Sequence, residues 1–83
     1  MDHMDLWAAI ENFARSLNLS CSALAKQSGL DATTFNKSKR WTVYGKPRWP
    51  STHSLAKILQ STNTSIEDFL KFMPSRMAKQ TSK

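Results

Sequence analysis

The sequence has 83 residues, which suits one compact domain with one modest core. Twelve lysines and arginines against six aspartates and glutamates give a formal net charge of +6, which favours a polyanionic partner such as nucleic acid or an anionic membrane surface, with solubility alone as the plainer alternative. A single cysteine excludes an internal disulfide framework and, with only two distant histidines, leaves no zinc-type ligand cluster. No apolar run approaches the roughly 20 residues of a membrane span. We therefore expect a cytoplasmic protein without metal or other cofactor.

The first predicted element is a helix over residues 5 to 17, which ends at Asn18. Apolar residues recur along it every three or four positions and therefore share one face of a helix. These residues are Leu6, Ile10, Phe13 and Leu17. We expect this face to contribute to the core.

A second, short helix is predicted over residues 21 to 28. Ser20 precedes it and is a good N-cap. Its inward positions are expected to be Leu24, Ala25 and Ser28.

Gly29 and Asp31 separate the second helix from a third. Gly29 is expected to close the second helix, because glycine adopts the left-handed conformation beyond a helix end without a side-chain penalty. Asp31 supplies the N-cap of a third helix over residues 32 to 39. Residues 40 to 50, RWTVYGKPRWP, then form a loop with some extended character, which is long for a helix connection.

Two more helices are predicted after this loop. Ser51 caps the fourth helix, and Thr64 with Glu67 makes a capping box for the fifth, which Pro74 stops. The residues expected to point inward from the two helices are Leu55, Ile58, Leu59, Ile66, Phe69, Leu70 and Met73.

The chain contains no internal repeat and no strand-like alternation, so the fold class is all-α. Residues 74 to 83 are polar and basic without an apolar period. We therefore expect one domain over residues 1 to 73, followed by a disordered tail or the start of a linker.

The joint between the second and third helices has a specific pattern. Two helices that cross steeply through a short turn need a small residue at the approach, a glycine in the turn and apolar residues on either side. Residues of these types occur in order as Leu24, Ala25, Gly29, Leu30 and Phe35. This is the pattern of a DNA-binding helix-turn-helix.

Residues 5 to 73 resemble the lambda-repressor-like helix-turn-helix family of phage and bacterial repressors. The capping Ser20, the LA pair at 24 and 25, the GL pair at 29 and 30, and the stretches SLAKIL and SIEDFL have familiar counterparts there. The resemblance implies a compact five-helix DNA-binding domain, with the helix-turn-helix at its second and third helices.

Two departures from the family concern packing. Ser28 and Ser38 stand where the family usually carries apolar side chains, so we expect Trp41 or Trp49 to fill the volume. The long loop after the third helix is similar to that of repressors whose DNA-binding domain precedes a LexA-like, self-cleaving peptidase domain, which would make this chain an N-terminal fragment.

The resemblance places the third helix in the major groove of DNA, with its first, second, fifth and sixth residues facing the bases. Those positions are Ala32, Thr33, Asn36 and Lys37. Asn36 can pair bidentately with adenine, Lys37 can donate to guanine acceptors, and Thr33 can serve either way. The alternative is that they are merely the solvated face of an amphipathic helix.

Contacts to the DNA backbone are expected from the start of the second helix and from the basic loop. The candidates are Cys21, Ser22, Thr34, Lys39, Arg40, Lys46 and Arg48. Between Asn12 and Ile66 the only carboxylate is Asp31, which leaves this part of the chain strongly cationic. The aromatic residues Trp41, Tyr44 and Trp49 lie among these cations and suit stacking on a single strand, but we expect them to pack instead.

Nothing in the sequence indicates catalysis, because no nucleophile with a base, metal cluster or paired carboxylates is visible. The expected partner is a double-stranded DNA operator, bound by a homodimer that is joined around Phe72 and Met73 or by a further C-terminal domain. The main alternative is a protein-interaction module, such as an antitoxin or adaptor, that keeps the helix-turn-helix shape without reading DNA. A basic amphipathic membrane-surface helix ranks third.

Overall fold

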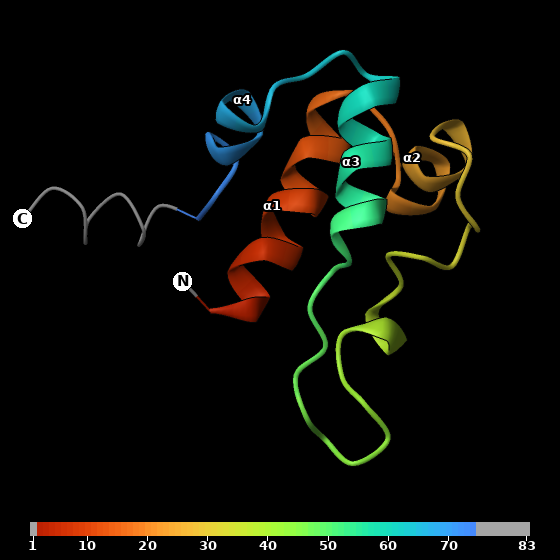
Figure 1. The fold of residues 1–83 in the computed structure, drawn as a ribbon, viewed down its shortest axis with the longest axis vertical. Coiled ribbons are helices and arrows are strands. Elements are labelled where there is room, and N and C mark those ends of the chain that lie inside the picture. Colours follow the sequence, from red (N-terminus) through yellow and green to blue (C-terminus); the bar gives the residue numbers. More distant parts are fainter. Residues whose placement is uncertain (1, 75–83) are drawn as a thin grey trace, which may run out of the picture.

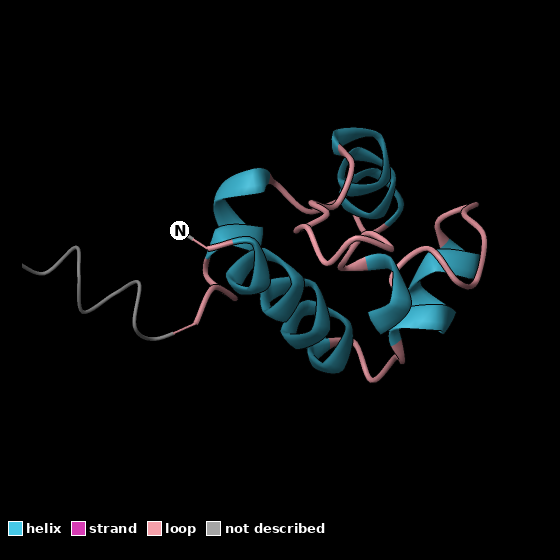
Figure 2. Ribbon diagram, turned by 90° about the horizontal axis from the view of Figure 1, so that it is seen from below, coloured by secondary structure: helices cyan, strands magenta, loops and turns pink. Residues whose placement is uncertain are grey.

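The computed structural model describes residues 2 to 74, and within them the protein is helical (Figure 1). The elements in chain order are α1 (His3–Ser16), α2 (Cys21–Gln27), the 3-10 helix η1 (Lys37–Lys39), α3 (Thr52–Ser61) and α4 (Ile66–Leu70). Loops join the helices, and the described part of the chain contains no strand (Figure 2). The all-α prediction is confirmed, but four α-helices form where five were expected, since residues 32 to 39 contain only η1.

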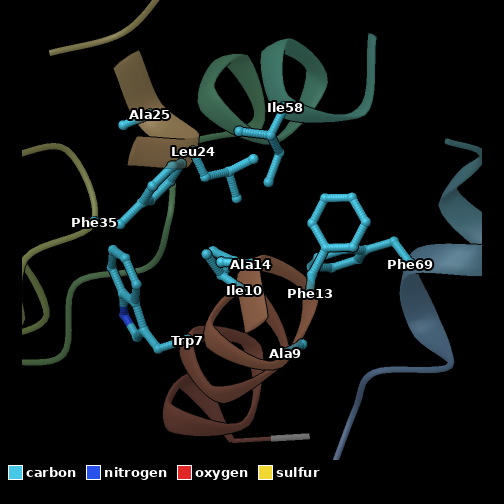
Figure 3. Close-up of a cluster of buried hydrophobic side chains, with 10 residues drawn as sticks. All are labelled: Trp7, Ala9, Ile10, Phe13, Ala14, Leu24, Ala25, Phe35, Ile58 and Phe69. Carbon is cyan, nitrogen blue, oxygen red and sulfur yellow. The ribbon is translucent and has the colours of Figure 1, made fainter. Parts of the chain in front are cut away.

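The core is built around α1, which packs against α2 and α4, while α2 also packs against α3. Figure 3 shows the buried side chains that these elements contribute: Trp7, Ala9, Ile10, Phe13, Ala14, Leu24, Ala25, Phe35, Ile58 and Phe69. Aromatic rings meet edge to face within it, with Phe13 5.7 Å from Phe69 and Trp7 6.5 Å from Phe35 between ring centroids. The core thus extends from the helix-turn-helix to α4.

Helices α1, α2 and α3 end in the same way, with a residue of positive φ just past the cap. These residues are Asn18 (φ 59°), Gly29 (φ 79°) and Asn63 (φ 54°). In each case the next amide N–H returns to a carbonyl in the last turn, as Leu30 N does to Ala25 O at 2.8 Å. Glycine and asparagine are the residues that adopt this conformation at least cost, so the local sequence determines where the helices stop.

The predicted N-caps of α2 and α3 are confirmed. Ser20 Oγ accepts a hydrogen bond from Ala23 N at 3.1 Å, and Ser51 Oγ accepts one from Ser54 N at 3.0 Å. The predicted cap of α4 is wrong by one residue, because Ser65 Oγ accepts from Asp68 N at 3.1 Å.

Several expected core residues lie elsewhere. Leu17 is 40% exposed because α1 ends before it, and Ile66 and Leu70 are 52% and 49% exposed on the outer side of α4. Leu55 and Leu59 are only partly buried against the core. Apart from Pro74, the expected tail over residues 74 to 83 lies outside the described residues, and the domain boundary stays a prediction.

Candidate nucleic-acid interface

The turn of the helix-turn-helix forms as predicted at Gly29. Gly29 N donates to Lys26 O at 3.1 Å and Leu30 N donates to Ala25 O, so both carbonyls at the end of α2 are satisfied. A Cβ placed on Gly29 would meet no heavy atom within 4 Å. The glycine is therefore required by its positive φ and not by a close approach of backbones.

The segment that follows, residues 32 to 39, is not the continuous helix that was expected. Thr34 N donates to Asp31 O at 3.0 Å and Asn36 N donates to Thr33 O at 3.1 Å, and each of these hydrogen bonds closes a turn of four residues. The backbone is then extended at Asn36 (φ −65°, ψ 153°), and η1 begins after it. The segment thus consists of two tight turns joined at an extended residue.

Side chains at the start of the segment bond to its backbone. Asp31 Oδ1 accepts from Thr33 N at 2.9 Å and from Thr33 Oγ1 at 2.8 Å, while Thr34 Oγ1 donates to Asp31 O at 2.6 Å. Asp31 makes the predicted capping hydrogen bond, but no α-helix follows it.

The hydrogen bonds that Thr33 donates also stabilise the charged form of Asp31. The backbone N–H of Thr33, followed by its hydroxyl, lowers the pKa of this carboxyl below its ordinary value. The Asp31 turn is therefore anchored by a carboxylate at neutral pH.

The structure places the four predicted base-contacting residues on this one segment. Thr33, Asn36 and Lys37 are exposed, and Ala32 is partly buried. Phe35 is 1% exposed and confirms the prediction that it belongs to the core. Because the segment is not a regular helix, the helical spacing by which these residues were selected does not hold here.

Among the predicted backbone contacts, Ser22, Lys39, Lys46 and Arg48 are exposed, whereas Cys21 and Thr34 are partly buried. Burial, and then the negative charge of Glu11, raises the pKa of the Cys21 thiol, which agrees with an inert side chain.

The structure buries Arg40, which argues against its predicted contact with a phosphate. The residue is 6% exposed, and its guanidinium carbon lies 5.3 Å from the centroid of the Trp7 ring. Nη2 donates to Glu11 Oε2 at 2.8 Å. The side chain therefore ties the loop to α1 and is not available to DNA.

Further contacts with α1 hold both ends of the loop. Trp7 Nε1 donates to Arg48 O at 2.8 Å. Arg40 O accepts from Arg48 N at 2.9 Å and lies 3.2 Å from Nε2 of the buried His3. Sequence reasoning missed Glu11, Trp7 and His3 as partners of the loop.

The expectation that Trp41 or Trp49 fills space left by serines is also wrong. Ser28 is buried, and its hydroxyl lies 2.8 Å from that of Ser61, while Ser38 is exposed. Trp41 and Trp49 are 45% and 51% exposed, and both rings lie against His3.

A surface pocket of about 330 Å3 lies between the 32-to-39 segment and the start of α3. Its lining includes Thr33, Lys39, Arg48, Trp49 and Ser51. Of the predicted contacts, Thr33, Thr34 and Lys39 from the segment and Arg48 from the loop line this pocket, so these four face one region of the surface.

Residues 2 to 74 contain neither a metal-binding cluster nor a membrane-spanning helix. No group of three or more histidine, cysteine, aspartate or glutamate side chains there is arranged to hold a metal ion. None of the helices in this part of the chain has the length and apolar character needed to cross a membrane.

A glycine-closed turn, a buried anchor at Phe35 and an exposed polar segment after the turn are features of a DNA-binding helix-turn-helix, although no α-helix forms over residues 32 to 39. The family model for the Cro/C1-type HTH DNA-binding domain matches residues 9–75, and the chain belongs to this family. The family is generally non-enzymatic. No match was found among curated proteins or among solved structures.

Proposed function

We propose that this domain is a transcriptional regulator of the phage-repressor type that recognises a specific double-stranded DNA sequence. One observation supports this most directly: Thr33, Asn36 and Lys37 are exposed on the segment that directly follows the Gly29 turn. In a helix-turn-helix protein, that segment enters the major groove.

The exposed side chains have the chemistry for reading bases. Asn36 suits adenine, which offers a donor and an acceptor, and Lys37 suits the two acceptors of guanine. Thr33 differs, because its hydroxyl already donates to Asp31; its oxygen can still accept a hydrogen bond, and its methyl group can meet a thymine methyl. Ala32, which is partly buried, plays a smaller part in this proposal.

Phosphate contacts in this proposal come from Ser22, Lys39, Lys46 and Arg48, which are exposed. Cys21 contributes only its backbone N–H, and the Thr34 hydroxyl is engaged with Asp31 O. With about three cations per subunit neutralising phosphates, a dimer would show a log–log salt slope on the order of −5.

We further propose that the regulator binds DNA as a homodimer, since two copies would read two half-sites. Phe72 and Met73 pack against the core of their own chain, with the Phe72 ring 5.4 Å from that of Phe13. The exposed Ile66 and Leu70 lie one turn apart on α4 and are better candidates for the dimer contact. A LexA-like peptidase domain after this one stays a prediction.

Selection from random double-stranded DNA tests the function. The purified chain is incubated with the library at near-physiological salt, and the retained DNA is sequenced. Enrichment of an inverted repeat is expected. Retention without enrichment would mean backbone binding only, and no retention would favour the protein-interaction alternative.

Paired lysine variants then test the base contacts. Lys37→Ala is expected to change the preferred sequence, with a discrimination of about 1 to 3 kcal/mol at one position. Lys57→Ala removes the same charge from an exposed position on α3 and serves as the matched control. Equal effects of the two variants on all sequences would exclude Lys37 from base reading.

A further inference from the structure

The loop after η1 folds into a small hairpin, which we define as residues 41 to 47. An antiparallel bridge joins Trp41 to Pro47, and Thr42 N donates to Lys46 O at 2.8 Å. Gly45 (φ 77°) closes the turn, with its N–H donating to Thr42 O at 3.0 Å. Figure 1 shows this hairpin projecting below the helices, away from the core.

The tip of the hairpin presents two apolar side chains to solvent. Val43 is 93% exposed and Tyr44 is 87% exposed, which are the largest values among the exposed large hydrophobic residues. Neither is needed for packing within the domain, so the expectation that Tyr44 packs is wrong. An apolar pair held out in this way suggests a contact with another molecule.

The hairpin is attached to α1 at both of its ends. Just before the hairpin, the guanidinium of Arg40 donates to the carboxylate of Glu11. Just after it, the backbone carbonyl of Arg48 accepts a hydrogen bond from the indole N–H of Trp7. The Trp41 ring meets the ring of His3 edge to face at 4.5 Å. These contacts fix the position of the tip relative to α1.

The surroundings of the tip carry positive charge. Lys46 is exposed within the hairpin and Arg48 directly after it, while η1 before it contributes the exposed Lys37 and Lys39. No carboxylate occurs between Asp31 and Ile66. Two copies of the chain meeting at this tip would bring like charges together, whereas DNA phosphates would neutralise them.

We propose that the hairpin is a second DNA-contacting element, whose Val43 and Tyr44 enter the minor groove beside the site read by residues 32 to 39. The minor groove is only about 6 Å wide, which suits one aromatic and one branched side chain at the end of a narrow turn. Apolar side chains from a cationic element contact sugars there or wedge between base steps. Lys46 binds a flanking phosphate. This inference rests on the proposed function.

Binding to the selected operator tests the inference. Val43→Ala/Tyr44→Ala is compared with the wild-type chain by fluorescence anisotropy, and the minor groove is mapped by hydroxyl-radical footprinting. We expect an affinity loss of at least about tenfold and loss of the protection that flanks the major-groove site. The thermal midpoint stays unchanged, because both side chains are exposed.

Two further variants serve as controls. Tyr44→Phe keeps the ring and is expected to retain binding. Lys46→Ala is expected to flatten the salt slope by about one, whereas the tip variant leaves the slope unchanged because it alters no charge.

Wild-type affinity and footprint in the tip variant would overturn the inference and leave the proposed function intact. A tip variant that only shifts the sedimentation coefficient of the free protein would also overturn it, since the tip would then join two copies. A wild-type chain that enriches no DNA sequence would overturn the proposed function itself.

Discussion

The ion pair between Arg40 and Glu11 is predicted to stabilise the fold without contributing to DNA affinity. The Arg40 side chain is 7% exposed and that of Glu11 is 33% exposed, with 2.8 Å between Nη2 and Oε2. Removing one partner of a fully buried pair costs about 3 to 5 kcal/mol, while an exposed pair contributes about 1 kcal/mol or less. For this half-buried geometry we expect Glu11→Gln to lower the free energy of unfolding by about 2 to 3 kcal/mol.

Arg40→Ala should destabilise the domain to a similar degree, because it removes the same ion pair. It also removes the contact of the guanidinium with Trp7. In a domain of this size, 1 kcal/mol shifts the thermal midpoint by about 4 to 8 °C, so each variant should melt about 8 to 24 °C below wild type. Circular dichroism during heating and in urea measures both quantities. Arg15→Ala, which changes an exposed arginine of α1, should stay within about 0.5 kcal/mol.

A double variant completes the test, since Glu11→Gln/Arg40→Ala should be less destabilised than the sum of the single variants. The salt slope of DNA binding should be the same for Arg40→Ala as for wild type. An unchanged melting temperature together with a slope flattened by about one would refute the reasoning and restore Arg40 as a phosphate contact.

Three other measurements test the fold around the site. Gly29→Ala should cost about 1 to 2 kcal/mol in urea denaturation because of its positive φ, and Gly29→Asn should cost less, since Asn18 and Asn63 hold the same conformation; equal stability of all three proteins would contradict the turn. Phe69→Ala should lose about 3 to 5 kcal/mol, because the ring is fully buried against Phe13, and a loss below 1 kcal/mol would mean that α4 does not pack as described. The pKa of Asp31 is lowered in the folded protein, so the stabilising effect of its carboxylate is complete above the ordinary pKa of aspartate and disappears as the pH falls through the lowered value. NMR titration should give a low midpoint for Asp31. Asp31→Asn should remove the loss of stability that the protonation of Asp31 causes at acid pH.

The break in the 32-to-39 segment shows where two local preferences competed. Asp31 is a good N-cap, and the resemblance to repressors favoured a helix after it. Thr33 and Thr34 bond back to Asp31, and these bonds are also local. Phe35 is anchored in the core and Arg40 on α1, so both ends of this segment are also held by contacts with distant parts of the chain.

The cations of the loop show what a local sequence pattern does not reveal. The run of cations from Lys37 to Arg48 is evident in the sequence, but the structure separates them into exposed side chains and one buried anchor. Glu11 lies 29 residues before Arg40, and no local pattern shows that they meet. The same holds for His3 and Trp7, which contact the loop from the start of α1.

The sequence by itself determined where α2 and α3 begin and where α2 ends, because the caps Ser20 and Ser51 and the stop at Gly29 act within a few residues. Its glycine and apolar pattern also sufficed to indicate the helix-turn-helix. Only the tertiary structure decided that Arg40 is buried and that the apolar tip at Tyr44 is exposed. Both depend on how α1 meets a loop distant in the chain, and packing between distant segments is not encoded in any local run of residues.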